Sequence, residues 1–169
     1  MDLSKFKTLK TPYVIILIGP PLCGKSFFYN KFLENIDSDV TLVSRDETVM
    51  DVYGSRNYND AFSNVNQKQV DRALTQSLVD AGKSGKNVIV DMTHMTSKRR
   101  KGNLDYFGDE YNKVGVVFPI PSDEELIKRN KKRIEEEDKD LPMHIVKRMI
   151  SQYQPIRENE GFQKIISLK

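Results

Sequence analysis

The sequence predicts an α/β fold in which a parallel β-sheet is flanked by helices. Short apolar runs alternate along the chain with longer segments of helical pattern, an order typical of parallel sheets. The first run, residues 13–18 (YVIILI), has the uniform hydrophobicity of a strand buried on both faces, and it ends at Gly19 and two prolines. The 169 residues contain no repeat and no low-complexity linker, so we expect one domain, residues 1–169, around one core.

The other expected elements follow from apolar patterning and from residues that begin or end helices. Strands are predicted at residues 40–43, 87–90, 114–118 and 162–168, and helices at residues 25–33, about 64–81, 122–130 and 141–153. Gly82 and Gly85 should end the second helix. Ser122 should cap the third, and Pro142 should lie in the first turn of the fourth. Because parallel sheets bind ligands at the carboxyl ends of their strands, the polar residues that follow the strands should meet at one edge.

Composition and charge narrow the class of protein. The longest apolar run is too short to cross a membrane, and the N-terminal segment lacks the apolar stretch and cleavage site of a signal peptide. The single cysteine, Cys23, excludes an internal disulfide, so we expect the cytoplasm, or the host cytoplasm for a viral protein. A net charge of +3 is too small to indicate a protein that coats nucleic acid. The basic runs 98–101 and 128–133 fit either phosphate contacts or solvated surface, and charge alone leaves both open.

Residues 19–26 (GPPLCGKS) match the pattern G-x-x-x-x-G-K-[ST] of a phosphate-binding loop between a strand and a helix. In such a loop, backbone N–H groups and the N-terminus of the helix hold the phosphates of ATP or GTP. Lys25 should reach the outer phosphates, and the hydroxyl of Ser26 should bind Mg²⁺. The predicted nucleotide-binding residues are Gly19, Pro20, Pro21, Leu22, Cys23, Gly24, Lys25, Ser26 and Phe27.

Asp46 follows the second predicted strand and is the candidate general base of a phosphoryl transfer. A kinase needs a group near the γ-phosphate that accepts the proton of the attacking hydroxyl, and a carboxylate at a strand end can do this. The neighbouring Arg45 could pair with a phosphate. Aspartate is also common at helix starts, so the residues alone leave Asp46 equally open as a helix N-cap.

Four motifs, in this order and spacing, resemble the 5'-kinase domain of phage polynucleotide kinase. They are GPPLCGKS (19–26), SRDE (44–47), DMTH followed by SKRR (91–100), and ELIKRNKKR followed by LPMHIVKRM (125–149). The resemblance runs from about Tyr13 to Tyr153. It implies a P-loop kinase fold with a helical lid, and transfer of the γ-phosphate of ATP, with magnesium, to the 5'-hydroxyl end of DNA or RNA in nucleic acid repair.

On the donor side, the resemblance implies that Lys25 and Ser26 hold the phosphates and magnesium. Asp91 would help to hold Mg²⁺ or its waters, unless it caps the next segment. Arg129 and Arg133, four residues apart on one helix face, would be lid arginines on the transferring phosphoryl group. Solvated surface is the alternative for both.

On the acceptor side, the resemblance makes Asp46 the general base that activates the 5'-hydroxyl. The acceptor would be bound by Arg45 and Asp46 together with Thr93 and His94, although His94 fits a passive surface residue equally well. Nucleic acid 5' ends are thus the expected partners, no membrane is involved, and the oligomeric state is not indicated.

The sequence departs from this family at two positions. Leu22 stands where the family often has a glycine, so the loop must accept a side chain there. Val49 stands where the phage enzyme has an arginine that contacts nucleic acid. Val49 motivates an alternative acceptor, a hydroxymethylated base in phage DNA or a free nucleoside, and a non-catalytic nucleotide-dependent binding module is a third possibility. No phosphatase domain is expected.

Overall fold

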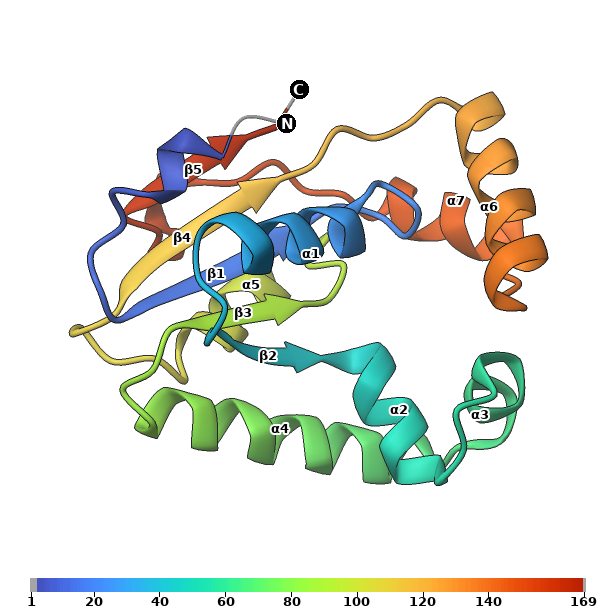
Figure 1. Cartoon of the computed structure of the whole chain (residues 1–169), viewed down its shortest axis with the longest axis horizontal. Helices are drawn as coiled ribbons and strands as arrows, with labels where there is room; N and C mark the ends of the chain where they lie inside the picture. Colours follow the sequence, from blue (N-terminus) through green and yellow to red (C-terminus); the bar gives the residue numbers. More distant parts are fainter. Residues whose placement is uncertain (1–2, 169) are drawn as a thin grey trace.

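The computed structural model describes residues 3–168. At its centre is a five-stranded sheet with the order β2-β3-β1-β4-β5. The strands are β1 Tyr13–Ile18, β2 Thr41–Ser44, β3 Val88–Asp91, β4 Asn112–Val117 and β5 Lys164–Ser167. Every neighbouring pair is parallel, so all carboxyl ends reach one edge of the sheet (Figure 1). The predicted α/β class with a parallel sheet is confirmed.

Helices cover both faces of this sheet. On one face lies α1 (Lys25–Asn35), and on the other lie α4 (Gln67–Lys83) and α5 (Ser97–Leu104). Alternate residues of β1 enter the two cores, with Ile15 on the α1 side and Ile16 on the α4 side. Because both faces are covered, β1 is buried along its whole length, which explains its uninterrupted apolar run.

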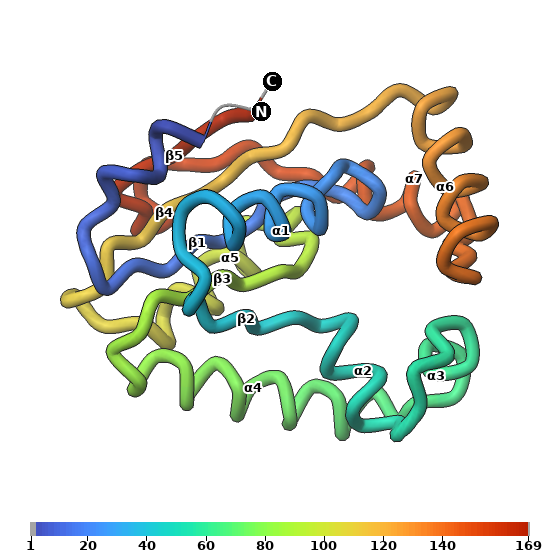
Figure 2. Tube along the Cα trace, in the orientation of Figure 1, coloured from blue at the N-terminus to red at the C-terminus, as the bar shows by residue number. Residues whose placement is uncertain are grey.

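Four further helices stand beyond the carboxyl ends of the strands. They are α2 Arg45–Tyr53, α3 Tyr58–Asn64, α6 Asp123–Glu137 and α7 Met143–Ser151. In Figure 2 the orange pair α6 and α7 and the cyan pair α2 and α3 approach this edge from opposite sides. None of the helices within residues 3–168 has the length and apolar content that crossing a membrane requires.

The helix predicted at about 64–81 is α4, but both of its ends differ from the prediction. Asn64 is instead the last residue of α3, and α4 begins at Gln67 behind the cap Asn66, whose side chain accepts from the Lys68 and Gln69 amides. At the other end α4 continues through Gly82 to Lys83. Gly82 is needed for packing, since a Cβ there would lie 2.0 Å from the Tyr106 carbonyl oxygen. Pro142 directly precedes α7 rather than lying within it.

The basic run 98–101 does not form one phosphate-binding surface, because Arg100 is completely buried. Its Nε and Nη2 donate to the Glu160 carboxylate at 2.6 and 2.8 Å, and Nη1 donates to the carbonyl of His94 at 3.1 Å. Glu160 is also buried, and the neighbouring guanidinium holds its pKa below the usual range against the opposing effect of burial. This pair fastens residues near 160 to the loop that follows β3.

Candidate active site

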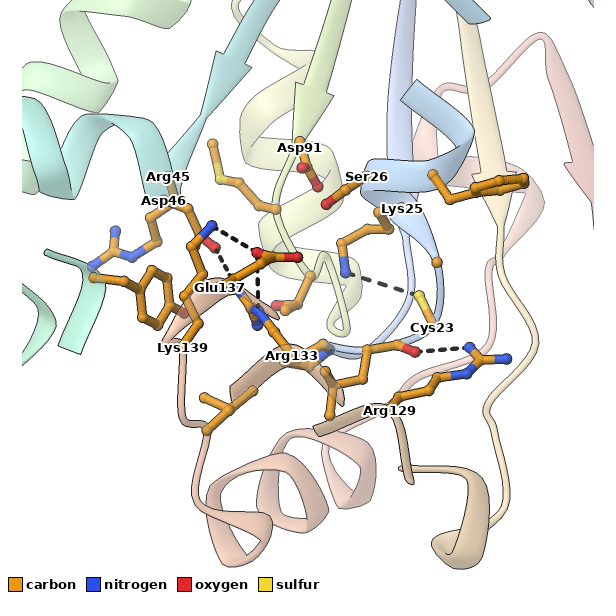
Figure 3. A pocket seen from close by; sticks show the side chains of 18 of the residues that line it. Cys23, Lys25, Ser26, Arg45, Asp46, Asp91, Arg129, Arg133, Glu137 and Lys139 are labelled. Atoms are coloured by element: carbon orange, nitrogen blue, oxygen red, sulfur yellow. Dashed lines mark hydrogen bonds and ion pairs between the residues drawn. The ribbon is translucent and has the colours of Figure 1, made fainter. Parts of the chain in front are cut away.

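A cavity of about 1890 Å³ opens at the carboxyl edge of the sheet. It is lined by the phosphate loop from Pro21 to Phe27, by the ends of β2 and β3, and by α2, α3, α6 and the start of α7. A pocket for a drug-sized ligand has about 300–1,000 Å³, so this cavity is large enough for a nucleotide and a second molecule. Figure 3 shows charged side chains from several of these elements pointing into it.

The phosphate loop has the backbone shape that its sequence predicts. Gly24 has φ +104° and begins α1, so the first amides of the helix face the loop. Nζ of Lys25 donates to the carbonyl oxygens of Gly19 at 3.1 Å and Pro20 at 2.8 Å. Gly19 is required by close packing, since a Cβ there would approach Cys23 Sγ to 2.7 Å. The loop therefore encloses its own lysine where phosphates would lie.

Leu22 carries the strain that its replacement of a glycine implies, with a left-handed φ of +66°. We expect Leu22→Gly to raise the free energy of unfolding by about 1 kcal/mol. A left-handed conformation costs an L-residue about 1–2 kcal/mol, and the flexibility of glycine in the unfolded chain offsets part of this gain. Urea denaturation measures the change. Leu22→Ala is the control, because it removes the side chain but keeps the strain; equal stabilisation by Ala would refute the explanation.

Ser26 and Asp91 are the residues that would hold Mg²⁺. Figure 3 shows the hydroxyl of Ser26 in α1 and the carboxylate of Asp91 at the end of β3 pointing toward each other, and both line the cavity. Within residues 3–168 no group of three or more His, Cys, Asp or Glu could hold a metal ion. One carboxylate and one hydroxyl still fit Mg²⁺, which takes the rest of its ligands from phosphates and water. Thr96, not Asp91, caps the following helix α5.

Burial raises the pKa of Asp91 to about 6, opposed by the charge of Lys25. The charged carboxylate is therefore less favourable in the folded protein than in the unfolded chain. The resulting loss of stability grows as the pH rises from about 4 to about 6, and it is complete above about pH 6. We expect Asp91→Asn to raise the free energy of unfolding at pH 8 by about 2 kcal/mol, since one pKa unit corresponds to about 1.4 kcal/mol. At pH 4 the gain should vanish. Denaturation in the presence of a chelator tests this, and an equal gain at both pH values would contradict it.

Asp46 lies in the first turn of α2, but it does not cap the helix. Ser44 is the cap, and its Oγ accepts from the Glu47 amide at 3.4 Å. The carboxylate of Asp46 instead faces the cavity, 3.9 Å from Nη2 of Arg133. Desolvation by the surrounding protein raises the pKa of Asp46, and the charges of Arg133 and Lys25 oppose that shift. A carboxylate of raised pKa is the better proton acceptor.

The two predicted lid arginines both line the cavity, yet they have different partners. Arg133 reaches across to Asp46 and lies 4.0 Å from Glu137 Oε2. Arg129 donates to Glu125 Oε1 at 2.7 Å and to the Leu22 carbonyl oxygen at 2.8 Å. Arg129 thereby joins α6 to the phosphate loop, whereas Arg133 faces the candidate base.

His94 is placed differently from its expected position in an acceptor groove. Its ring is buried, with Nδ1 2.8 Å from the Leu17 carbonyl oxygen and Nε2 2.8 Å from Asn103 Nδ2. Burial lowers the pKa of His94 to about 4, so the ring is neutral. The side chain braces the strand before the phosphate loop. Its neighbour Thr93 does line the cavity, and the Thr93 carbonyl accepts from the Gly19 amide at 3.0 Å.

On the acceptor side, two further residues have protein partners. Arg45 lines the cavity but donates to Asp71 at 3.0 Å and to Gln67 at 2.9 Å, so its charge is already paired. Val49 is completely buried in a cluster that joins α2, α3 and α4. An arginine at this place could not contact an acceptor without leaving that core. The departure at Val49 is thus a packing feature of this chain.

Three residues that the sequence analysis missed also line the cavity: Tyr58, Asn59 and Lys139. The Arg133 guanidinium lies 4.9 Å from the centre of the Tyr58 ring, and Lys139 Nζ lies 5.6 Å from it. Burial raises the pKa of Tyr58 to about 12, so the phenol stays protonated. No sequence motif marks these residues, because the contact joins segments about eighty positions apart in the chain.

A model of a protein family described as an AAA domain matches residues 14–156. The chain belongs to this AAA-domain family. The matched segment contains the phosphate loop, Asp46, Asp91 and both lid arginines. The family match and the fold together place this chain among the P-loop NTPases and kinases, which bind nucleotides and typically use Mg²⁺.

Three solved structures show the same fold. One chain in the structure of the Pnkp1/Rnl/Hen1 RNA repair complex is 24% identical, with a TM-score of 0.67 over 95% of this chain and 52% of that one. A gluconokinase from Sinorhizobium meliloti 1021 is 13% identical, with a TM-score of 0.59 over 94% and 82%. Kti12 from Chaetomium thermophilum, in complex with ADP-AlF3, is 18% identical, with a TM-score of 0.61 over 92% and 88%. This AAA domain spans about half of the chain that it matches in the RNA repair complex.

Proposed function

We propose that this protein is an ATP-dependent polynucleotide kinase, which transfers the γ-phosphate of ATP to the 5'-hydroxyl end of DNA or RNA. The observation that carries the proposal is the placement of Asp46 opposite the phosphate loop and 3.9 Å from Arg133. A nucleotide-binding module without a reaction has no need of a carboxylate there. The match to a chain of an RNA repair complex supports a nucleic acid as the acceptor.

The reaction would proceed between Lys25 and Asp46. Lys25 and the amides of the loop bind the β- and γ-phosphates, and the acceptor hydroxyl lies against the Asp46 carboxylate. As the hydroxyl oxygen attacks the γ-phosphorus, Asp46 accepts the proton and ADP leaves with the electrons of the broken bond. Arg133 neutralises charge that develops on the transferred group. Ser26 and Asp91 would hold Mg²⁺, which supplies charge neutralisation at the phosphates when it is bound.

An acceptor screen with γ-labelled ATP tests this proposal. We expect label on 5'-hydroxyl oligonucleotides of DNA, RNA or both, and no label on the same oligonucleotides carrying a 5'-phosphate. Release of the label together with the terminal nucleotide identifies the 5' end. A screen that labels small molecules but no oligonucleotide would overturn the polynucleotide assignment.

A second acceptor class is favoured by Val49, a buried valine at the position where the family resemblance leads us to expect an arginine that contacts nucleic acid. The acceptor would then be a nucleoside or a hydroxymethylated base within DNA, phosphorylated by the same residues. The screen separates the two classes, because phosphate on an internal base survives removal of the terminal nucleotide. The fold shared with a gluconokinase is compatible with a small acceptor.

A further inference from the structure

The tip of α6 is bound to α3 by a contact that no motif marks. Asn59 Nδ2 donates to the Asp138 carbonyl oxygen at 2.7 Å, and its Oδ1 accepts from the Asp140 amide at 3.0 Å. One side-chain amide thus satisfies two backbone groups of the turn that follows α6. Two further features define the conformation of this turn. Asp138, which follows α6, has a left-handed φ of +51°, and Asn130 Oδ1 accepts from the Leu141 amide at 3.3 Å.

Tyr58, the neighbour of Asn59 and the first residue of α3, adds a second contact to the same region. Its ring is buried, and it faces the Arg133 guanidinium at 4.9 Å and Lys139 Nζ at 5.6 Å. A cation held over an aromatic face is attracted by the ring quadrupole, and the attraction grows when water is excluded. Only 20% of the Arg133 side chain is exposed. The ring therefore restricts the directions in which Arg133 can point.

Together these two residues join the wall that carries the candidate base to the helix that carries Arg133. The helices α2, which carries Asp46, and α3 lie on one side of the carboxyl edge of the sheet, and α6, which carries Arg133, lies on the other (Figure 1). Without this link, α6 is attached on its other side through Arg129 and Leu22. The distance between Asp46 and Arg133 would then depend on how far α6 moves away from α2.

We propose that Tyr58 and Asn59 are positioning residues, which hold Arg133 at the distance from Asp46 that phosphoryl transfer needs. This inference rests on the proposed function, because it gives Arg133 a role at the transferred phosphoryl group. Neither residue touches the reacting atoms. Both act through the turn after α6 and through the direction of one guanidinium.

The first test measures the contact itself. Hydrogen exchange of single amides in the full chain should show a protected Asp140 amide, and Asn59→Ala should speed its exchange at least tenfold. The Leu141 amide, held by Asn130, should change less. Asn64→Ala is the matched control, since Asn64 lies in the same helix and its side chain donates to Asp60 of that helix rather than to the turn after α6. Unchanged exchange at Asp140 in Asn59→Ala would overturn the contact.

The second test measures its consequence for the reaction. Single-turnover transfer to a 5'-hydroxyl oligonucleotide should fall about tenfold in Asn59→Ala and in Tyr58→Leu, while the affinity for ADP stays the same. Tyr58→Phe keeps the ring over Arg133 but removes the hydroxyl, which also interacts with the Arg133 side chain, so it should lose less of the rate than Tyr58→Leu. Thermal denaturation shows whether each variant is folded. A wild-type rate in folded Asn59→Ala, or equal rates in Tyr58→Leu and Tyr58→Phe, would refute the positioning role.

If the wild-type protein labels no oligonucleotide, the proposed acceptor is wrong, and the positioning role is decided by nucleotide affinities instead. Arg133 would contact only the γ-phosphate, so Arg133→Ala should lower the affinity for ATP relative to ADP. Asn59→Ala should lower the same ratio part of the way, and Asn64→Ala should leave it unchanged. A ratio equal to wild type in Asn59→Ala, beside a lowered ratio in Arg133→Ala, would reject the proposal.

Discussion

Asp46→Asn is expected to lower the rate of phosphoryl transfer about 10²–10⁴-fold, the range typical of losing a general base. The amide has the size of the carboxylate but cannot accept the proton of the attacking hydroxyl. The cap of α2 is Ser44, so the fold of this helix does not depend on Asp46. Affinity for ATP should be preserved, because the phosphate loop is untouched.

Single-turnover kinetics and equilibrium binding of ATP measure the two quantities separately. Asp51→Asn is the matched control, since Asp51 lies in the same helix, pairs with Arg56 and is not part of the cavity. It should transfer phosphate at the wild-type rate. The wild-type rate should also rise as the pH passes the pKa of Asp46, which desolvation by the surrounding protein raises above the ordinary value. An Asp46→Asn variant with full activity would remove the base from the mechanism.

Arg133→Ala is expected to lower the transfer rate about 10²–10³-fold, the cost of losing one donor to a developing charge. Lysine should restore only part of this rate, because a point charge cannot replace the planar guanidinium that lies over Tyr58. Arg129→Ala should behave differently. Arg129 bonds to the Leu22 carbonyl oxygen, so its removal should mainly weaken ATP binding.

The comparison of kcat with KM for ATP distinguishes these outcomes. For Arg133→Ala the larger part of the loss should lie in kcat, with a smaller rise in KM from the lost γ-phosphate contact, and for Arg129→Ala the loss should lie mainly in KM. Lys131→Ala is the control, since Lys131 lies between the two on α6, pairs with Glu135 and is exposed. Equal effects of the two arginine variants on both constants would show that the structure does not separate their roles.

The sheet was predictable from sequence, and the helices around the site were less so. Continuous apolar runs predict strands such as residues 13–18 and 87–90, because a strand that is buried on both faces has no position that faces water. The helices α2 and α3 gave no comparable signal. They are short and partly exposed, and they pack through Val49 and other residues far apart in sequence, so their hydrophobic pattern is weak.

In the candidate site, too, some residues were predictable from sequence and others were not. The phosphate loop is local in sequence, so its motif predicted the loop between β1 and α1 and marked Leu22 as the position where the backbone must accept a side chain. His94 was misplaced because a histidine beside a strand end is polar in sequence, whereas its two ring nitrogens bond within the protein. Tyr58 and Asn59 could not be found, since their partners are brought near only by the complete fold.

The bond from Arg129 to the carbonyl of Leu22 has a thermodynamic consequence. It attaches α6 to the loop that would bind the donor, while Asn59 attaches the end of the same helix to the wall of the acceptor side. One rigid element therefore contacts both halves of the cavity. When a shared element responds to two ligands, the factor by which the first changes the affinity of the second equals the factor in the other direction. The factor by which bound nucleotide changes the affinity for the acceptor should thus equal the factor by which bound acceptor changes the affinity for the nucleotide, and binding measurements of either ligand can determine it.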